Sequence, residues 1–142
     1  MSSPDTVCHQ EFDESRFLAS EYEPARPEKA AFHIIPVPLE QSVSYGGGTA
    51  RGPAAILAAS QQLEAWDGIS APGEAGLYTA PAVDCDAPIG TVLERIEAAT
   101  AHALRCKALP VILGGEHTVT LGALRALDAE AARTGEPFGV VQ

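Results

Sequence analysis

The residue best placed to do chemistry in this sequence is a histidine that follows two glycines. Leu109–Leu113 is a short apolar run, and Gly114, Gly115, Glu116 and His117 come directly after it. Such a run is typical of a strand buried on both faces of a parallel sheet. Glycines let the chain turn sharply at the strand's carboxyl end, where open α/β sheets hold their ligands. The spacing therefore predicts that His117 lies at the mouth of a site and not in the core.

The helix expected after this turn favours a neutral histidine. Apolar spacing predicts a helix over residues 117–133, and Glu116 suits the start of that helix by charge. The positive end of the helix disfavours imidazolium, so the ring of His117 should stay in the form that binds metals. The same positive end repels a cation, so a metal site here needs carboxylates from neighbouring strands. The alternative is that His117 only hydrogen-bonds a backbone carbonyl in a turn.

Two segments of the chain resemble the ureohydrolases, the family of arginases and agmatinases. Residues 113–127, LGGEHTVTLGALRAL, are similar to the family's Gly-Gly-Asp/Glu-His-Ser segment. Residues 36–67, PVPLEQSVSYGGGTARGPAAILAASQQLEAWD, are similar to the first loop and helix of its agmatinase-like members. The glycines of this second segment do not form a phosphate-binding loop, because Arg51 stands where a G-x-G-x-x-G frame from Gly46 requires glycine.

The resemblance implies an agmatinase-like hydrolase that converts agmatine to putrescine and urea with a binuclear manganese (Mn2+) site. The histidine that ligates manganese in the family corresponds to His117, while Thr118 stands where the family has serine. Further metal ligands of the family lie in later Asp-Ala-His-x-Asp and Asp-x-Asp segments, so the resemblance covers only the N-terminal half of the pattern. No catalytic residue carries over, and the substrate-binding residues stay unknown. The alternatives are another guanidino substrate (guanidinobutyrate, arginine or formiminoglutamate) or a non-catalytic fragment or assembly module.

The elements that must position His117 alternate between strands and helices. We expect strands at 32–37, 109–113 and 138–141, a weaker strand at 77–83, and helices at 53–65, 91–107 and 117–133. With the resemblance, this order predicts an α/β fold, a three-layer αβα arrangement with a mainly parallel sheet, of which the chain forms the N-terminal half. Residues 1–28 read as an irregular N-terminal arm, and residues 29–142 as the N-terminal part of a single domain.

Other polar side chains receive structural roles. His33 lies inside the first apolar run, so we expect a core histidine with its hydrogen bonds satisfied. Asp84 and Asp86 precede a proline and a glycine, which is typical of a turn, and they receive no catalytic role. His102 falls outside the apolar stripe of its helix and should lie at the surface.

Composition limits the partners of this chain. Its 142 residues carry a net charge of -10 with only nine Lys and Arg, which argues against nucleic acid and suits a small cationic guanidino substrate. The N-terminus lacks the features of a signal peptide, and no apolar run is long enough to cross a membrane. Three cysteines without a C-x-x-C pair indicate neither a disulfide framework nor a zinc site. We therefore expect a cytoplasmic protein without membrane partners, and a homo-oligomer.

Overall fold

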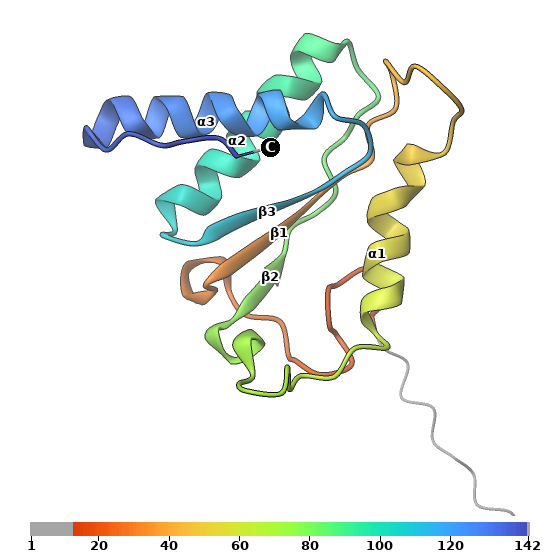
Figure 1. Cartoon of the computed structure of the whole chain (residues 1–142), viewed down its shortest axis with the longest axis vertical. Helices are drawn as coiled ribbons and strands as arrows, with labels where there is room; N and C mark the ends of the chain where they lie inside the picture. The colour runs from red at the N-terminus through yellow and green to blue at the C-terminus, as the bar shows by residue number, and fades with distance from the viewer. Residues whose placement is uncertain (1–12, 142) are drawn as a thin grey trace, which may run out of the picture.

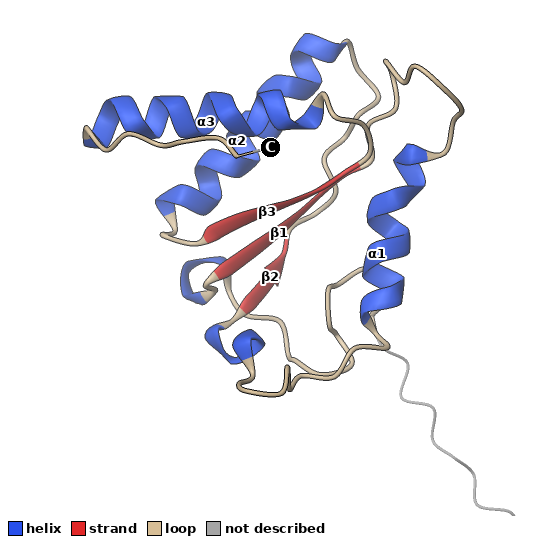
Figure 2. Cartoon of the chain, in the orientation of Figure 1, coloured by secondary structure: helices blue, strands red, loops and turns tan. Residues whose placement is uncertain are grey.

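A computed structural model of the chain describes residues 13–141. The elements follow one another as β1 (Phe32–Val37), α1 (Gly52–Ser60), β2 (Leu77–Thr79), α2 (Ile89–Arg105), β3 (Leu109–Gly114) and α3 (Val119–Thr134) (Figure 1). Short 3-10 turns cover Pro27–Lys29, Thr49–Arg51 and Pro72–Ala75. The strands form a parallel sheet in the order β2-β1-β3. Helices α2 and α3 lie on one face and α1 on the other, which confirms the three-layer α/β prediction (Figure 2).

The central strand β1 owes its position to a continuous apolar sequence. Phe32 is aligned with both Leu77 and Leu109, and pairing with β3 continues to Val37 opposite Gly114. Five successive residues of β1, from His33 onward, are buried, as expected of a strand with neighbours on both edges and layers on both faces. Because all three strands run in the same direction, their carboxyl ends meet at one edge of the sheet.

The main core lies between the sheet and the pair α2 and α3. Ile35 and Val37 of β1 pack with Val92 and Ile96 of α2, and these four side chains have at most 1% of their surface exposed. Gly122 lets the two helices come close, because a Cβ atom there would lie only 2.7 Å from the Cβ of Ile96. Burial of this apolar surface is the principal stabilisation of the sheet and its helices.

The described part of the expected N-terminal arm packs against its own chain. The amides of Phe17 and Leu18 donate to the hydroxyls of Thr79 and Ser60, at 3.0 and 2.9 Å. Farther along, the amide of Ala25 donates to the carbonyl of Leu77 at 3.1 Å. The segment thus connects the end of α1 to the outer edge of β2. Residues 1–12 of the expected arm lie outside the described residues.

The strand expected at residues 138–141 does not form, which corrects that prediction. Val140 is 64% exposed and Val141 fully exposed, and within residues 13–141 β3 pairs only with β1. A β-branched run becomes a strand only where a partner supplies the ladder hydrogen bonds, because β-propensity largely reflects packing against neighbours. The segment therefore remains irregular after Gly135, which ends α3 in a left-handed conformation as its sequence predicts.

Several element boundaries differ from the predicted ones. Helix α1 ends at Ser60 and not at residue 65, because the next amides bond three residues back and tighten the turn. Regular β2 ends at Thr79 and not at residue 83: the amide of Ala80 still donates to the carbonyl of Ile34, but the next bond to β1 comes from Val83 to Pro36, one residue out of register. Helix α2 begins at Ile89, two residues early, with the amide of Val92 donating to the carbonyl of Pro88 at 3.2 Å.

Candidate functional site

The turn between β3 and α3 lies at the carboxyl edge of the sheet and is held tightly against the chain that leaves β1. The amide of Gly115 donates to the carbonyl of Val37, and the amide of Glu116 to that of Leu39, both at 3.0 Å. A Cβ atom on Gly115 would lie 2.0 Å from the carbonyl oxygen of Leu39, so this position has no room for any side chain. Neither Gly114 nor Gly115 has a positive φ. These glycines are required for space, which corrects the expectation that they adopt angles closed to other residues.

His117 occupies the position that its sequence predicts. It lies in the turn before α3 with its side chain exposed, and its carbonyl accepts the amide of Thr120 at 3.1 Å. The imidazole is therefore at the carboxyl end of β3 and outside the core. Across residues 13–141 no three His, Cys, Asp or Glu side chains lie close enough to share a metal ion. The role of His117 as a metal ligand stays a prediction.

Glu116, next to this histidine, is an internal anchor. Only 7% of its surface is exposed, and its carboxylate accepts the amides of Gln41 at 3.0 Å and Ser42 at 2.7 Å, together with the Ser42 hydroxyl at 2.7 Å. Burial alone would raise the pKa of Glu116, but hydrogen bonds from Ser42 and Gln41 outweigh it and hold the pKa below its usual value. Since α3 begins only at Val119, the predicted role of Glu116 at the helix start is replaced by this contact with the 41–42 segment.

Glu40 holds the loop that follows β1, residues 40–50, through hydrogen bonds to its far end. Its carboxylate accepts the amides of Gly48 at 2.7 Å and Ala50 at 2.9 Å, and the Thr49 hydroxyl at 3.0 Å. The amides of Ala50 and Gly48 lower the pKa of Glu40, because they stabilise its ionised form. Gly48 has φ +117°, a left-handed angle that lets the loop close around this carboxylate. Residues 40–50 are thus an ordered loop at the carboxyl end of β1.

Gln41 connects this loop to a third one. Its side-chain amide donates to the carbonyls of Cys85 at 3.0 Å and Ala87 at 2.8 Å, in the segment between β2 and α2. Sequence reasoning did not single out Glu40, Gln41 or Ser42. What these residues share in the sequence is that they are three consecutive polar residues shortly after a strand, where side chains reach the loops of neighbouring strands.

The other polar residues have the expected structural roles. His33 is buried, and its Nε2 donates to the carbonyl of Pro27 at 2.9 Å, which confirms a satisfied core histidine. Asp84 accepts the amide of Asp86 at 3.0 Å and pairs with Arg95 at 2.9 Å, as in the expected turn. His102 is exposed on α2, as its position in the sequence predicts.

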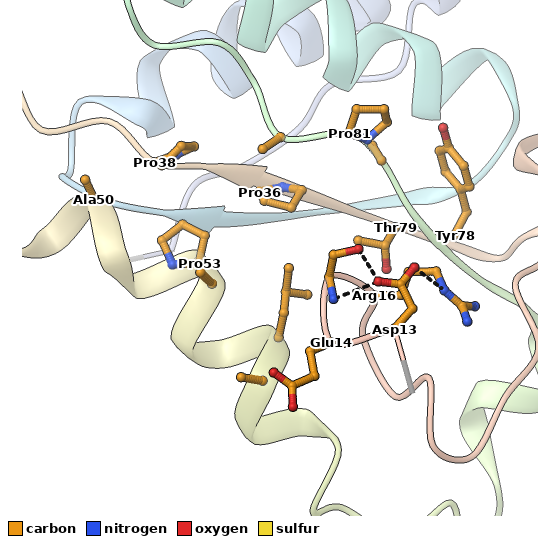
Figure 3. A pocket seen from close by; sticks show the side chains of 16 residues that line it. Asp13, Glu14, Arg16, Pro36, Pro38, Ala50, Pro53, Tyr78, Thr79 and Pro81 are labelled. Atoms are coloured by element: carbon orange, nitrogen blue, oxygen red, sulfur yellow. Dashed lines mark hydrogen bonds and ion pairs between the residues drawn. The ribbon is translucent and has the colours of Figure 1, made fainter. Parts of the chain in front are cut away.

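A hollow of about 840 Å³ lies on the α1 side of the sheet (Figure 3). Its walls include Pro36, Pro53 and Leu57, and His117 is not among its lining residues. At its polar end Arg16 and Asp13 form an ion pair at 3.1 Å. Glu14 and Tyr78 are the other titratable residues of its lining, and most of the wall is apolar, so the hollow offers few polar groups beyond this ion pair. The carboxyl edge around His117 is the better candidate for a functional site.

The chain has an αβα layer structure with a Gly-Gly-Glu-His turn at the carboxyl edge of its sheet. These features define a class of α/β proteins whose functional polar side chains lie at the ends of strands. Residues 30–142 match the Arginase family, and the chain belongs to that family.

Named relatives support this assignment. The N(1)-aminopropylagmatine ureohydrolase of Synechocystis sp. is 38% identical over 125 residues, covering 80% of this chain and 39% of the relative. The enzyme of the same name from Thermococcus kodakarensis is 34% identical over 117 residues, covering 78% of this chain and 40% of the relative. The crystal structure of agmatine ureohydrolase of Thermoplasma volcanium matches with a TM-score of 0.68 at 24% identity, covering 78% of this chain and 38% of that one, and shows the shared fold.

The chain spans about two fifths of the length of these curated relatives. Within residues 13–141, none of the helices combines the length and apolar character needed to cross a bilayer.

Proposed function

We propose that this chain is part of an agmatinase-like amidinohydrolase that hydrolyses a guanidino compound to urea and an amine. The observation that carries the proposal is the exposed imidazole of His117, held at the carboxyl edge of the sheet by a turn with no room for side chains at Gly115. Agmatine, giving putrescine, is the proposed substrate, and the names of the relatives add N(1)-aminopropylagmatine as a candidate. Arginine, guanidinobutyrate and formiminoglutamate are the alternatives.

The metal in this proposal is a pair of manganese ions with His117 as one ligand. An exposed imidazole suits one position of such a centre, but the residues described here supply no cluster of three donors. They therefore fit one ligand position and not a complete site. When bound, a metal pair supplies hydroxide near neutral pH, which a poorly electrophilic guanidinium carbon requires. The remaining ligands would come from outside residues 13–141.

Residues of this chain would hold the reacting region in place and favour a cationic substrate. Glu40 and Glu116 are both ionised at neutral pH, since hydrogen bonds lower the pKa of each. The net charge of -10, which includes these two carboxylates, gives the protein a negative field that would attract guanidinium compounds. A cytoplasmic location and a homo-oligomeric state belong to the same proposal.

The test is urea release, with manganese, by a full-length protein in which these residues are followed by the family's later Asp-Ala-His-x-Asp and Asp-x-Asp segments. The substrates measured are agmatine, N(1)-aminopropylagmatine, arginine and guanidinobutyrate. We expect His117→Ala to lower turnover at least ~100-fold, because a lost ligand weakens metal binding and distorts the site. The control is His102→Ala, which removes an exposed histidine on α2. Full activity of His117→Ala would remove His117 from the site and refute the proposal.

A further inference from the structure

A chain of hydroxyl and carboxylate groups runs past His117 and connects both of its sequence neighbours to one serine. The Ser42 hydroxyl lies 2.7 Å from Oε1 of Glu116 and 3.1 Å from the Thr118 hydroxyl. The Ser42 amide donates to the other carboxylate oxygen of Glu116 at 2.7 Å. Ser42 is therefore bound to the residue before His117 and to the residue after it.

The chemistry of the groups fixes the direction of these hydrogen bonds. The carboxylate of Glu116 already accepts two backbone amides, and the Ser42 hydroxyl is the donor of the 2.7 Å bond to its other oxygen, so the single hydrogen of that hydroxyl points to Glu116. Between the two hydroxyls, Thr118 must then be the donor. Thr118 stands at the N-cap of α3, where threonine usually accepts a helix amide, but its side chain makes no such capping bond. Its hydroxyl faces Ser42 instead.

The imidazole of His117 depends on this backbone for its orientation. Within the described chain, no hydrogen bond holds the imidazole of His117, whereas metal-binding histidines usually have their second nitrogen fixed by a partner. The backbone from residue 116 to 118 therefore sets the position and direction of the Cα–Cβ bond from which the ring extends. A buried carboxylate with three hydrogen bonds holds it more firmly than an ordinary solvated turn would.

We propose that Ser42 is a positioning residue for His117: acting through Glu116 and Thr118, it holds the backbone on both sides of the imidazole in the orientation that receives a metal ion. The proposal rests on the proposed function, in which His117 is a manganese ligand. It also assigns a role to the loop after β1, which would support the ligand that follows β3 without contacting the metal itself.

The experiment compares variants of the full-length protein by three measurements: the manganese dissociation constant from the electron paramagnetic resonance signal of free Mn2+, urea release, and thermal unfolding. Ser42→Ala removes the bridging hydroxyl, and Ser42→Thr retains one. Ser44→Ala is the matched control, an exposed serine of the same loop. His117→Ala is measured in parallel to test the ligand itself.

We expect Ser42→Ala to raise the manganese dissociation constant about 10-fold with a matching loss of turnover, since partners that orient a ligand typically change metal affinity by 10- to 100-fold. Ser42→Thr should restore the affinity to within about 2-fold, and Ser44→Ala should leave it unchanged. The proposal is overturned if Ser42→Ala binds manganese normally while His117→Ala does not, or if Ser42→Thr fails to restore the affinity although its thermal stability is normal. If His117→Ala itself keeps normal manganese affinity, the proposed function fails together with the inference.

Discussion

At the scale of single residues, acidic side chains after the strands of this protein serve as hydrogen-bond acceptors for loops. Glu40, after β1, and Glu116, after β3, each accept backbone amides, and the pKa of each carboxylate lies below its usual value. Carboxylates at strand ends resemble metal ligands in a sequence, but a carboxylate surrounded by amides already has its charge satisfied. Loop order around His117 therefore depends on ionised acids.

Glu40 makes this dependence measurable as a function of pH. Its folded pKa lies below the ordinary value of 4.5, so its stabilising contribution is present above that pH and is lost as the pH falls through the folded pKa. Glu40→Gln should therefore unfold at a lower temperature than the unmodified chain near neutral pH, and the two melting temperatures should converge as the pH falls through the folded pKa of Glu40. Glu94→Gln, on the exposed face of α2, serves as the control and should show no such convergence. A difference that persists unchanged at low pH would contradict the role assigned to the ionised carboxylate.

A substitution at Gly115 can test whether the turn has room for a side chain. Gly115→Ala places a Cβ atom against the carbonyl oxygen of Leu39, which is backbone and cannot rotate away. We expect the free energy of unfolding to fall by about 1–3 kcal/mol, the usual range for overpacking. Gly90→Ala is the matched control, because a Cβ atom there meets nothing within 4 Å and alanine suits a helix better than glycine. Chemical denaturation of both variants measures the difference, and equal stability of the two would refute the close contact.

At the scale of elements, three loops at the carboxyl edge behave as one unit. The loop after β1 is bonded to the turn after β3 through Glu116, and to the segment after β2 through Gln41. The arm bonds to α1 and to β2, at the outer edge of the sheet. The three loops can bond to one another because the strands are parallel and their carboxyl ends lie side by side.

Ser60 is the residue through which the arm is attached to α1. It is buried, accepts the amide of Leu18 at 2.9 Å and donates to the carbonyl of Leu57 at 2.6 Å. Ser60→Ala should leave the Leu18 amide without its partner and lower the free energy of unfolding by about 1–3 kcal/mol. The arm should then be cut sooner in limited proteolysis, while Ser44→Ala should change neither measurement. Unaltered cleavage of Ser60→Ala would show that the arm is held by other contacts.

The sequence predicts those elements whose own residues decide their structure. The predicted bounds of β1, β3 and α3 agree with the structure to within two residues, because a buried apolar run or a long amphipathic stripe favours one structure strongly. The segment 138–141 has the composition of a strand, but strand formation depends on a neighbouring chain that its own residues cannot specify. The network of Ser42 and Glu116 was also beyond prediction, since it joins residues 74 positions apart.

At the scale of the whole molecule, the match to the Arginase family covers most of the chain, whereas the metal donors are few. Residues 30–142 match the family, whereas His117 is the one metal ligand that the resemblance places in the described chain. The relatives are about two and a half times as long as the matched segment. A bridged metal pair needs several carboxylates, so the proposed activity requires ligands beyond those that residues 13–141 supply.

These 142 residues by themselves should lack the proposed activity. A single imidazole cannot hold two divalent ions, so the 142-residue chain should release no urea from agmatine with manganese, and titration should show no tight manganese binding. The full-length protein measured under the same conditions should do both. Exposed apolar side chains at Leu109, Phe138 and Val140 give the shorter chain a further tendency to self-associate, which analytical ultracentrifugation measures. Manganese-dependent urea release by the 142 residues alone would show that they contain a complete site, and it would favour ligands contributed between copies of the chain over ligands from a longer one.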